Sequence, residues 1–378
     1  MIRNLIIKNF KIHANTALEL KNLNILTGIN GVGKSSIIQS LLLLRQSYEA
    51  NLLSQGLQLN MPHCNIGLIK DAIYQGGETD EICFILDTDE RNRLSWNFKP
   101  EDNDYEKNFI PATGKSPDDV SAISLFNDKF QYLSAARLSP RESYPLDTNS
   151  VVTKRRLSLE KGQGELAVHF LHQYGIFKKE NIKSVLMKHK EQALDDLLSQ
   201  TNAWEREISP GVNVHPIVNG KSFSLKYSFD KKSDVTNQFS AENVGYGLSY
   251  ALPIIIAALS SVKGSLLLIE NPEAHLHAKG QSKLAELLAL AAQSGIQIIL
   301  ETHSEHILNG ILVACKKFEL DQKGIDKELV RIHHFHRDEV KHCAIVEPIK
   351  ILDDGKIDKQ PKDFFDQTET DLNFLLGF

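Results

Sequence analysis

The sequence of 378 residues predicts an α/β fold, and three features indicate it. Two apolar runs, at 265–269 and 296–300, are typical of buried parallel strands, and a segment with helical periodicity separates them. Shorter alternating runs at 81–88, 93–98 and 129–137 favour antiparallel strands. A strand at 23–27 leads into a glycine-rich turn and then an apolar helix. We therefore expect a buried parallel sheet with an antiparallel β subdomain.

Composition limits the compartment and the partners. The formal net charge of -5 gives no global positive field, so any contact with DNA or RNA needs a local patch. The four cysteines are scattered, without a CxxC pair, which favours a reducing compartment. The N-terminus carries charges among its apolar residues, and the apolar runs are too short to cross a bilayer. We expect a cytoplasmic protein without a membrane partner.

The glycine-rich turn has the spacing G-x-x-x-x-G-K-S over 28–35. Glycines let backbone N–H groups wrap around phosphate oxygens at a helix N-terminus, so strand, turn and helix together predict a phosphate-binding loop. Lys34 would neutralise phosphate oxygens, and the Ser35 hydroxyl would bind Mg²⁺. The predicted nucleotide-binding residues are Asn30, Gly31, Val32, Gly33, Lys34, Ser35 and Ser36.

Two strand ends and one helix start complete this predicted constellation. Glu270 ends the strand at 266–270, where a carboxylate can hold Mg²⁺ directly or through water. His303 follows the next buried strand. The helix start at 245–249 is either a second phosphate site or a plain cap. Its small residues are Gly245, Gly247 and Ser249.

The middle of the chain predicts loops and an inserted helical arm. The polar segment 101–119 predicts an exposed loop, and Gln75 is either an ordinary turn residue or a residue that reaches the metal and the attacking water. Apolar residues at helical spacing over 165–207 predict helices with one break near Gly175. Lysines at 178–190 favour a solvated face over a contact with a nucleic-acid backbone. Trp204 is expected to anchor the arm on the core.

The combination resembles the ATP-binding-cassette (ABC) branch of the P-loop ATPases. In particular, it resembles the RecF/SMC-like and OLD-type AAA ATPases of DNA maintenance and bacterial anti-phage defence. The stretches that carry the resemblance are "LIIKNFK", "GINGVGKSS", "ENPEAHLHAKGQ" and "ETHSEHIL". The end of the chain, "PKDFFDQTETDLNFLLGF", resembles the tail of small stand-alone members.

The resemblance implies roles for these residues. Lys34 and Ser35 would bind the phosphates and Mg²⁺ of ATP, Glu270 would be the carboxylate on the magnesium side, and His303 would sense the γ-phosphate. The helix start at 245–249 matches only loosely the signature loop that closes over ATP held by a second subunit. Two copies would therefore assemble head to tail around two nucleotides, as a dimer or as part of a higher oligomer.

One departure from the family pattern affects catalysis. Asn271 follows Glu270, at the position where the family usually has the glutamate that polarises water, and an amide cannot accept that proton. Glu273 lies two residues further on. Two interpretations stay open: slow hydrolysis assisted by Glu273, and a dimerisation switch that depends on ATP binding. His275 and His277 suggest either a metal site or, more economically, a turn at the dimer interface.

The effector is also open. OLD-type nucleases carry a Toprim domain after the ATPase, whereas the residues after His303 are expected to form a helix, two strands and a tail. One hypothesis is an ATPase that controls a separate effector, such as a nuclease or toxin. A DNA-repair ATPase of RecF type or an ATP-regulated nuclease is the alternative, and a transporter ATPase is disfavoured. The nuclease would use a C-terminal cluster of Asp353, Asp354, Asp358, His333, His334, His336 and His342.

These observations divide the chain into four predicted parts. Residues 1–140 hold the P-loop and the β subdomain, and 141–240 hold the inserted arm with two short strands. Residues 241–310 contain the signature-like helix start, the acidic strand end and the histidine. Residues 311–378 form a β hairpin and a tail.

Overall fold

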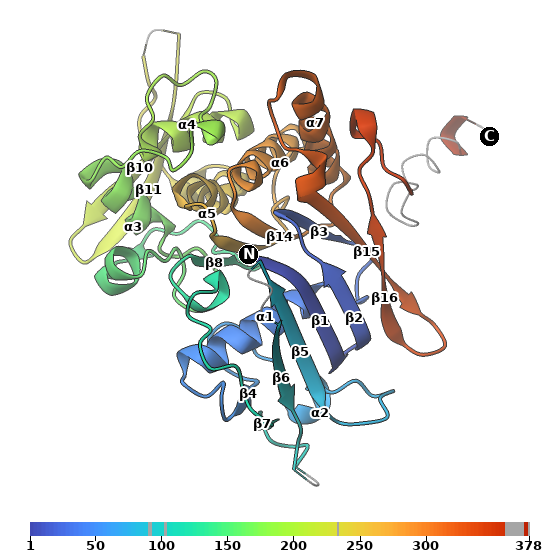
Figure 1. Ribbon diagram of the computed structural model, residues 1–378. Coiled ribbons are helices and arrows are strands. Elements are labelled where there is room, and N and C mark those ends of the chain that lie inside the picture. The colour runs from blue at the N-terminus through green and yellow to red at the C-terminus, as the bar shows by residue number, and fades with distance from the viewer. Residues whose placement is uncertain (90–92, 102–103, 233, 360–373, 377–378) are drawn as a thin grey trace. The chain divides into compact units, whose positions relative to one another are not determined.

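The computed structural model describes residues 1–89, 93–101, 104–232, 234–359 and 374–376 (Figure 1). The chain divides into two compact units. Unit 1 comprises 1–127, 330–352 and 356–378, and unit 2 comprises 128–329 and 353–355. Each unit is described by itself, and the four predicted domain boundaries stay a prediction.

Unit 1 contains a six-stranded antiparallel sheet in the order β2-β1-β5-β6-β7-β4. The alternating runs of the sequence place Leu5, Ile7, Phe84 and Leu86 in the core, each fully buried. Figure 1 shows β1, β2, β5 and β6 as neighbouring ribbons. The strands are β1 (Ile2–Phe10), β2 (His13–Glu19), β4 (Gly56–Gln58), β5 (Ile82–Thr88), β6 (Arg93–Phe98) and β7 (Phe109–Thr113).

Unit 1 also holds the strand and helix on either side of the glycine-rich turn. The fully buried β3 (Leu23–Thr27) pairs in parallel with β15 (Val330–Asp338), which forms an antiparallel hairpin with β16 (Cys343–Ile349). Helix α1 (Lys34–Glu49) follows the turn and buries most of its residues, and the one-turn helix α2 spans Ile69–Ala72. The predicted strand, turn and helix are therefore present, and so is the C-terminal hairpin.

Unit 2 contains three parallel strands in the order β14-β13-β8. Strands β13 (Leu266–Glu270) and β14 (Gln297–Glu301) are the two predicted buried strands, with Glu270 paired to Glu301 at their carboxyl ends. The helices of this part are α5 (Tyr246–Ser260), α6 (Ala278–Gln293) and α7 (Glu305–Asp321).

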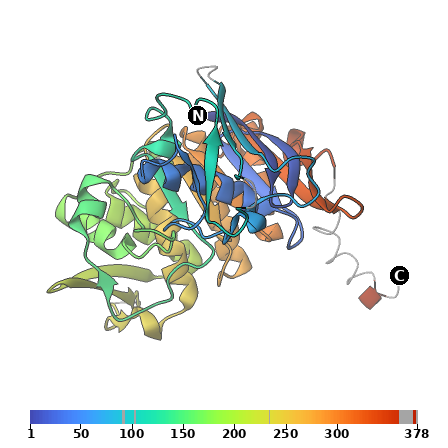
Figure 2. The ribbon, with the colours of Figure 1, turned by 90° about the horizontal axis from the view of Figure 1, so that it is seen from below.

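The rest of unit 2 is a small helical and β region. Helix α4 (Leu197–Ile208) and the hairpin of β10 (Val212–Asn219) and β11 (Ser222–Phe229) lie side by side in Figures 1 and 2, in green to yellow-green. Trp204 is buried and donates its Nε1–H to the carbonyl of Met187 at 3.0 Å, which lies within the same arm, so its role as an anchor on the core stays a prediction. The smaller elements are α3 (Ala167–Leu171), β9 (Tyr144–Pro145) and β12 (Phe239–Ser240).

Three local predictions were wrong. The expected loop 101–119 contains β7, because Ile110 is fully buried between β6 and β4. The run 129–137 contains β8 (Phe130–Leu133), which is parallel to β13 rather than antiparallel, since an alternating pattern does not encode strand direction. The break in the arm lies over 178–196, which has the 3₁₀ turn Val185–Met187 and an isolated bridge between Asn181 and Asp196, and not near Gly175, which lies in the π-helical segment His172–Phe177.

Within the described ranges, the structure has no helix with the length and apolar character needed to cross a bilayer.

Candidate functional site

The glycine-rich loop of unit 1 surrounds the buried amino group of Lys34. Gly28, Gly31 and Gly33 have φ values of 134°, 78° and 101°, which L side chains rarely adopt. Lys34 Nζ donates to the carbonyls of Gly28 at 2.8 Å and Ile29 at 2.6 Å. The ammonium is therefore held inside the loop by neutral acceptors, which a phosphate can replace with charge-assisted bonds.

Two packing contacts fix the shape of this loop. A Cβ on Gly28 would lie 2.2 Å from the carbonyl oxygen of Phe335 in β15, so this glycine is required by close approach of two backbones. On Gly33, a Cβ would lie 2.9 Å from Nε2 of His13. The packing of β15 and β2 against the loop therefore leaves no room for a Cβ at Gly28 or Gly33.

His13 braces the loop and was not predicted as a site residue. Its ring is fully buried, with Nε2 at 3.0 Å from the Gly33 carbonyl and Nδ1 at 2.9 Å from Thr16 Oγ1. A carbonyl only accepts, so Nε2 carries the hydrogen and the neutral ring accepts at Nδ1 from Thr16. Burial lowers the pKa of His13 to about 4, which keeps this neutral tautomer at physiological pH.

Gly31 and Val32 of the P-loop, and Gln75, differ in their exposure. Gly31 is exposed and has open space around the position of a Cβ, whereas Val32 is buried. Gln75 is exposed in the turn after Tyr74. The structure therefore gives the Gln75 side chain no role beyond the turn, and its reach to a metal stays a prediction.

In unit 2, the Glu270 carboxylate lies at the end of β13. Its oxygens accept from the Tyr132 hydroxyl at 3.3 Å and from the Ala135 N–H at 3.1 Å. Burial raises the pKa of Glu270, because these two contacts only partly replace water. A divalent cation would favour the charged form of such a carboxylate, so the residue fits a Mg²⁺ ligand.

Asn271 begins the turn that follows. Its φ of 44° is left-handed, a conformation that asparagine tolerates better than most residues. The Asn271 N–H donates to the Glu301 carbonyl at 2.9 Å, and its own carbonyl accepts from Arg137 at 2.6 Å. The backbone of the turn is thus fixed on both sides.

Glu273 joins this turn to the loop after β14. One carboxylate oxygen accepts from the Thr302 hydroxyl at 2.8 Å, and the other accepts from the His303 N–H at 2.9 Å. The structure therefore brings Glu273 and the His303 backbone together, with one hydrogen bond to each oxygen of the carboxylate. Ser304 then caps α7 by accepting from two N–H groups of its first turn.

The helix start at 245–249 lies against the same turn. Gly245 is the N-cap of α5, and a Cβ on Gly247 would lie 2.6 Å from the His275 carbonyl oxygen. Ser249 is buried within α5 rather than presented at its tip. Tyr250 packs edge-on against the His275 ring, with centroids 4.6 Å apart. The two glycines and Ser249 therefore differ in exposure, and only Gly247 is fixed by packing on the turn.

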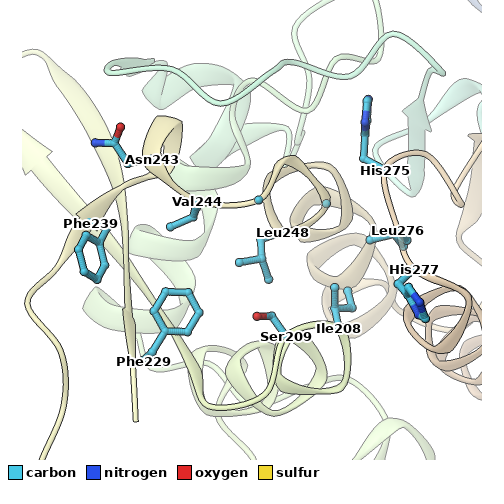
Figure 3. Close-up of a pocket in the computed structure, with 12 residues that line it drawn as sticks. Ile208, Ser209, Phe229, Phe239, Asn243, Val244, Leu248, His275, Leu276 and His277 are labelled. Carbon is cyan, nitrogen blue, oxygen red and sulfur yellow. The ribbon is translucent and has the colours of Figure 1, made fainter. Parts of the chain in front are cut away.

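A pocket of about 400 Å³ opens beside this contact (Figure 3). Its wall is mostly apolar, with Phe229, Val244, Leu248 and Leu276, while His275 and His277 lie toward one side. Within the described residues, no group of three or more His, Cys, Asp or Glu side chains is placed to hold a metal. The metal interpretation of the two histidines therefore gains no support.

The same finding covers the C-terminal Asp and His residues that lie in the described part. Asp353 pairs with Lys327 and Asp354 lies 3.8 Å from Lys316, within unit 2, as expected of a surface turn. His333 and His334 are both buried in β15. The structure thus lends no support to the nuclease alternative. Most of the predicted tail, 360–373 and 377–378, lies outside the described residues.

Arg137 was also missed by sequence reasoning, although it reaches the acidic strand end. It lies just after β8, and two of its three hydrogen bonds go to backbone atoms more than 130 residues away in the chain. Its only local signal is a single arginine after a short strand, which does not separate it from surface arginines.

Comparisons with known proteins agree with this arrangement. A family model described as "AAA domain, putative AbiEii toxin, Type IV TA system" matches residues 23–309, and one described as "Protein of unknown function (DUF3696)" matches 325–375. No curated protein gives a significant match.

Two solved structures are similar in fold over nearly the whole chain. One is an SMC head bound to the C-winged helix domain of ScpA, with 14% identity, a TM-score of 0.53, and coverage of 93% of this chain and 98% of that chain. The other is an SMC head domain with an extended coiled coil, bound to the C-terminal domain of ScpA derived from Pyrococcus furiosus. It has 14% identity, a TM-score of 0.52, and coverage of 100% and 98%. The fold is therefore that of the SMC-head branch of P-loop ATPases.

Proposed function

Because the chain belongs to the AAA-domain family of ABC-type ATPases, we propose that it is a switch in which ATP and Mg²⁺ join two copies head to tail. The assembled state would control a separate effector protein, such as a nuclease or toxin, in anti-phage defence. More broadly, the assembled state would control a complex that acts on DNA or RNA. ATP hydrolysis would be slow and would reset the switch.

The observation that carries this proposal is the engagement of Glu273. The family position for water activation holds an amide, Asn271, and the next carboxylate along the chain, Glu273, is bonded through both oxygens to Thr302 and His303. Each oxygen keeps a second acceptor site, but the two bonds hold the carboxylate between the two strand ends. This arrangement supports a latch between the two strand ends.

The other residues take roles that their environments permit. Bound Mg²⁺ATP would supply the negative phosphate oxygens that draw the Lys34 ammonium away from the carbonyls of its own loop. Ser35, Glu270 and, less directly, Gln75 would serve the metal. His303 would sense the γ-phosphate, and the N-terminus of α5 at Gly245 would face the nucleotide of the second copy.

The SMC-head structures support a partner protein by analogy. In those structures an SMC head is bound to a domain of ScpA. For this chain, the corresponding proposal is a separate protein that recognises the nucleotide-dependent assembly.

Two substitutions of Asn271 test whether this residue makes ATP hydrolysis slow. Asn271→Glu restores a carboxylate, and we expect it to raise ATP turnover by at least tenfold. Asn271→Gln is the matched control, because it shares the backbone cost of about 1 kcal/mol for a left-handed residue but remains an amide. Equal turnover in the two variants would contradict the placement of the catalytic turn.

Glu273→Gln separates the latch from the base. A glutamine keeps one acceptor oxygen, so a latch role predicts a loss of turnover of less than about tenfold, within the range of one weakened hydrogen bond. Loss of all turnover, with ATP binding retained, would show that Glu273 is the base and would overturn the switch interpretation.

A further inference from the structure

Arg137 ties together two segments of unit 2, the end of β8 and the turn after β13, at the acidic strand end. Its guanidinium donates to the carbonyls of Ser134 at 2.7 Å, Glu270 at 2.7 Å and Asn271 at 2.6 Å. The residue is 3% exposed. Three carbonyl acceptors without an intervening carboxylate make this a geometric clamp on the backbone, since the planar fork of arginine fixes the acceptors relative to one another.

The clamp also touches the helix that carries the signature-like residues. The Arg137 guanidinium lies 5.6 Å from the centroid of the Tyr250 ring on α5, within the range of a cation–π contact. Tyr250 in turn packs on His275, and the Gly247 backbone lies against the carbonyl of His275. The start of α5 and the turn after β13 are therefore one packed assembly with Arg137 at its centre.

The guanidinium stays charged in this environment. Burial lowers the pKa of Arg137 to about 10, against the opposing influence of Glu273 and Glu270. At neutral pH the guanidinium is therefore a buried cation. Its hydrogen bonds go to the backbone carbonyls of Ser134, Glu270 and Asn271. Charge-assisted bonds of this kind are stronger than neutral ones, so the turn is held more firmly than by backbone bonds alone.

We propose that Arg137 is a positioning residue that sets the turn from Glu270 to Asn271 for nucleotide chemistry and links that turn through Tyr250 to the start of α5. The proposal rests on the proposed ATP-dependent function. Movement of the α5 N-terminus, where a second copy would contact the nucleotide, would reach the acidic strand end through this arginine.

The experiment compares Arg137→Ala and Arg137→Lys with Arg45→Ala. Arg45 is a matched control, because it is also buried and donates to two carbonyls, those of Leu125 and Asn127, but it lies in unit 1 near the end of α1. All variants are first checked for folding by thermal unfolding. ATP binding, kcat, KM and amide hydrogen exchange of residues 268–278 and 301–304 are then measured.

We expect Arg137→Ala to lower kcat by about 100-fold, the effect of roughly 1 Å misplacement, with KM changed by less than threefold. Exchange of the Asn271 amide should rise with or without ATP, and Arg45→Ala should leave it unchanged. Millimolar guanidinium added to Arg137→Ala should restore part of kcat, while Arg137→Lys should retain only part because it lacks the fork.

The contrary outcomes separate this proposal from the proposed function. A wild-type protein without ATP binding contradicts the proposed function, but the exchange measurement still tests the clamp. Wild-type kcat and unchanged exchange in a folded Arg137→Ala variant overturn the positioning role, while the ATP switch stands. Equal rises in exchange at 268–278 in the Arg45 and Arg137 variants also overturn it, because they indicate general loosening.

Discussion

At the scale of single residues, Lys34 shows how the loop is prepared for a phosphate. Its buried ammonium donates hydrogen bonds to the neutral carbonyls of Gly28 and Ile29. We expect Lys34→Ala to weaken ATP binding by about 30- to 150-fold, because charge-assisted bonds contribute about 2–3 kcal/mol. Isothermal titration with a non-hydrolysable ATP analogue measures this, and near-native affinity would contradict the phosphate role.

Burial of His13 beside the same loop makes the stability of the folded protein depend on pH. The folded state keeps its ring neutral, with a pKa of about 4, whereas an unfolded histidine titrates near 6.5. Below pH 6.5 the unfolded state therefore binds a proton that the folded state rejects, and stability falls with decreasing pH until about pH 4. The contribution lost between pH 7 and 4.5 is roughly 2–3 kcal/mol.

The measurement compares urea unfolding of the wild type and of His13→Gln across this pH range. Other groups, including His333, whose pKa burial also lowers to about 4, titrate in both proteins. The difference in unfolding free energy between the two proteins isolates His13. We expect the wild type to lose roughly 2–3 kcal/mol of stability relative to His13→Gln as the pH falls from 7 to 4.5. A difference that does not vary with pH would show that the ring titrates in the folded state as it does in the unfolded state.

At the scale of elements, the contact of α5 with the turn after β13 makes a prediction about two glycines. A Cβ at Gly247 would lie 2.6 Å from a backbone oxygen, while Gly245 has nothing within 4 Å and a φ of -60°. Alanine is favoured over glycine in a helix by about 1 kcal/mol, but a clash with backbone costs about 1–3 kcal/mol.

We therefore expect Gly247→Ala to destabilise the protein by about 1–2 kcal/mol, and Gly245→Ala to change stability by less than about 0.5 kcal/mol. Thermal or urea unfolding of both variants checks this. If Gly247→Ala is as stable as Gly245→Ala, the packing of the helix start on His275 is not as the structure has it.

The elements also show where sequence patterns suffice. The P-loop, β13 and β14 were predictable because strong local signals, a glycine spacing and unbroken apolar runs, coincide with the elements themselves. The strand β7 lies in a polar segment and is fixed by pairing with β4 and β6, which no local pattern encodes. The direction of β8 depends on β13 in the same way.

The site residues also divide into those that local sequence patterns predict and those that only the tertiary structure reveals. Glu270 and Asn271 were recognisable from their place after a buried strand, although their roles remain predictions. The engagement of Glu273 by Thr302 and His303, and the bonds of Arg137 to the turn, join residues that are distant in the chain. Such contacts depend on tertiary packing, so periodicity and motif spacing cannot predict them.

At the scale of the whole molecule, the head-to-tail switch predicts a change of mass. Light scattering should give the monomer mass of 42.5 kDa without nucleotide and twice that mass with ATP and Mg²⁺. Lys34→Ala should stay monomeric. Gly245→Asp should also stay monomeric while it still binds ATP, because the added carboxylate repels the phosphates of a second copy but has room in its own chain.

Mixing the two variants tests the head-to-tail arrangement itself. In a dimer of one Lys34→Ala copy and one Gly245→Asp copy, one nucleotide site combines the intact Lys34 with the intact Gly245, and the other site carries both changes. We expect the mixture with ATP and Mg²⁺ to recover dimers that neither variant forms alone. If Lys34 and Gly245 served a nucleotide within the same copy, each copy would carry one damaged site and the mixture would remain monomeric. Recovery therefore requires that the two residues act across the interface.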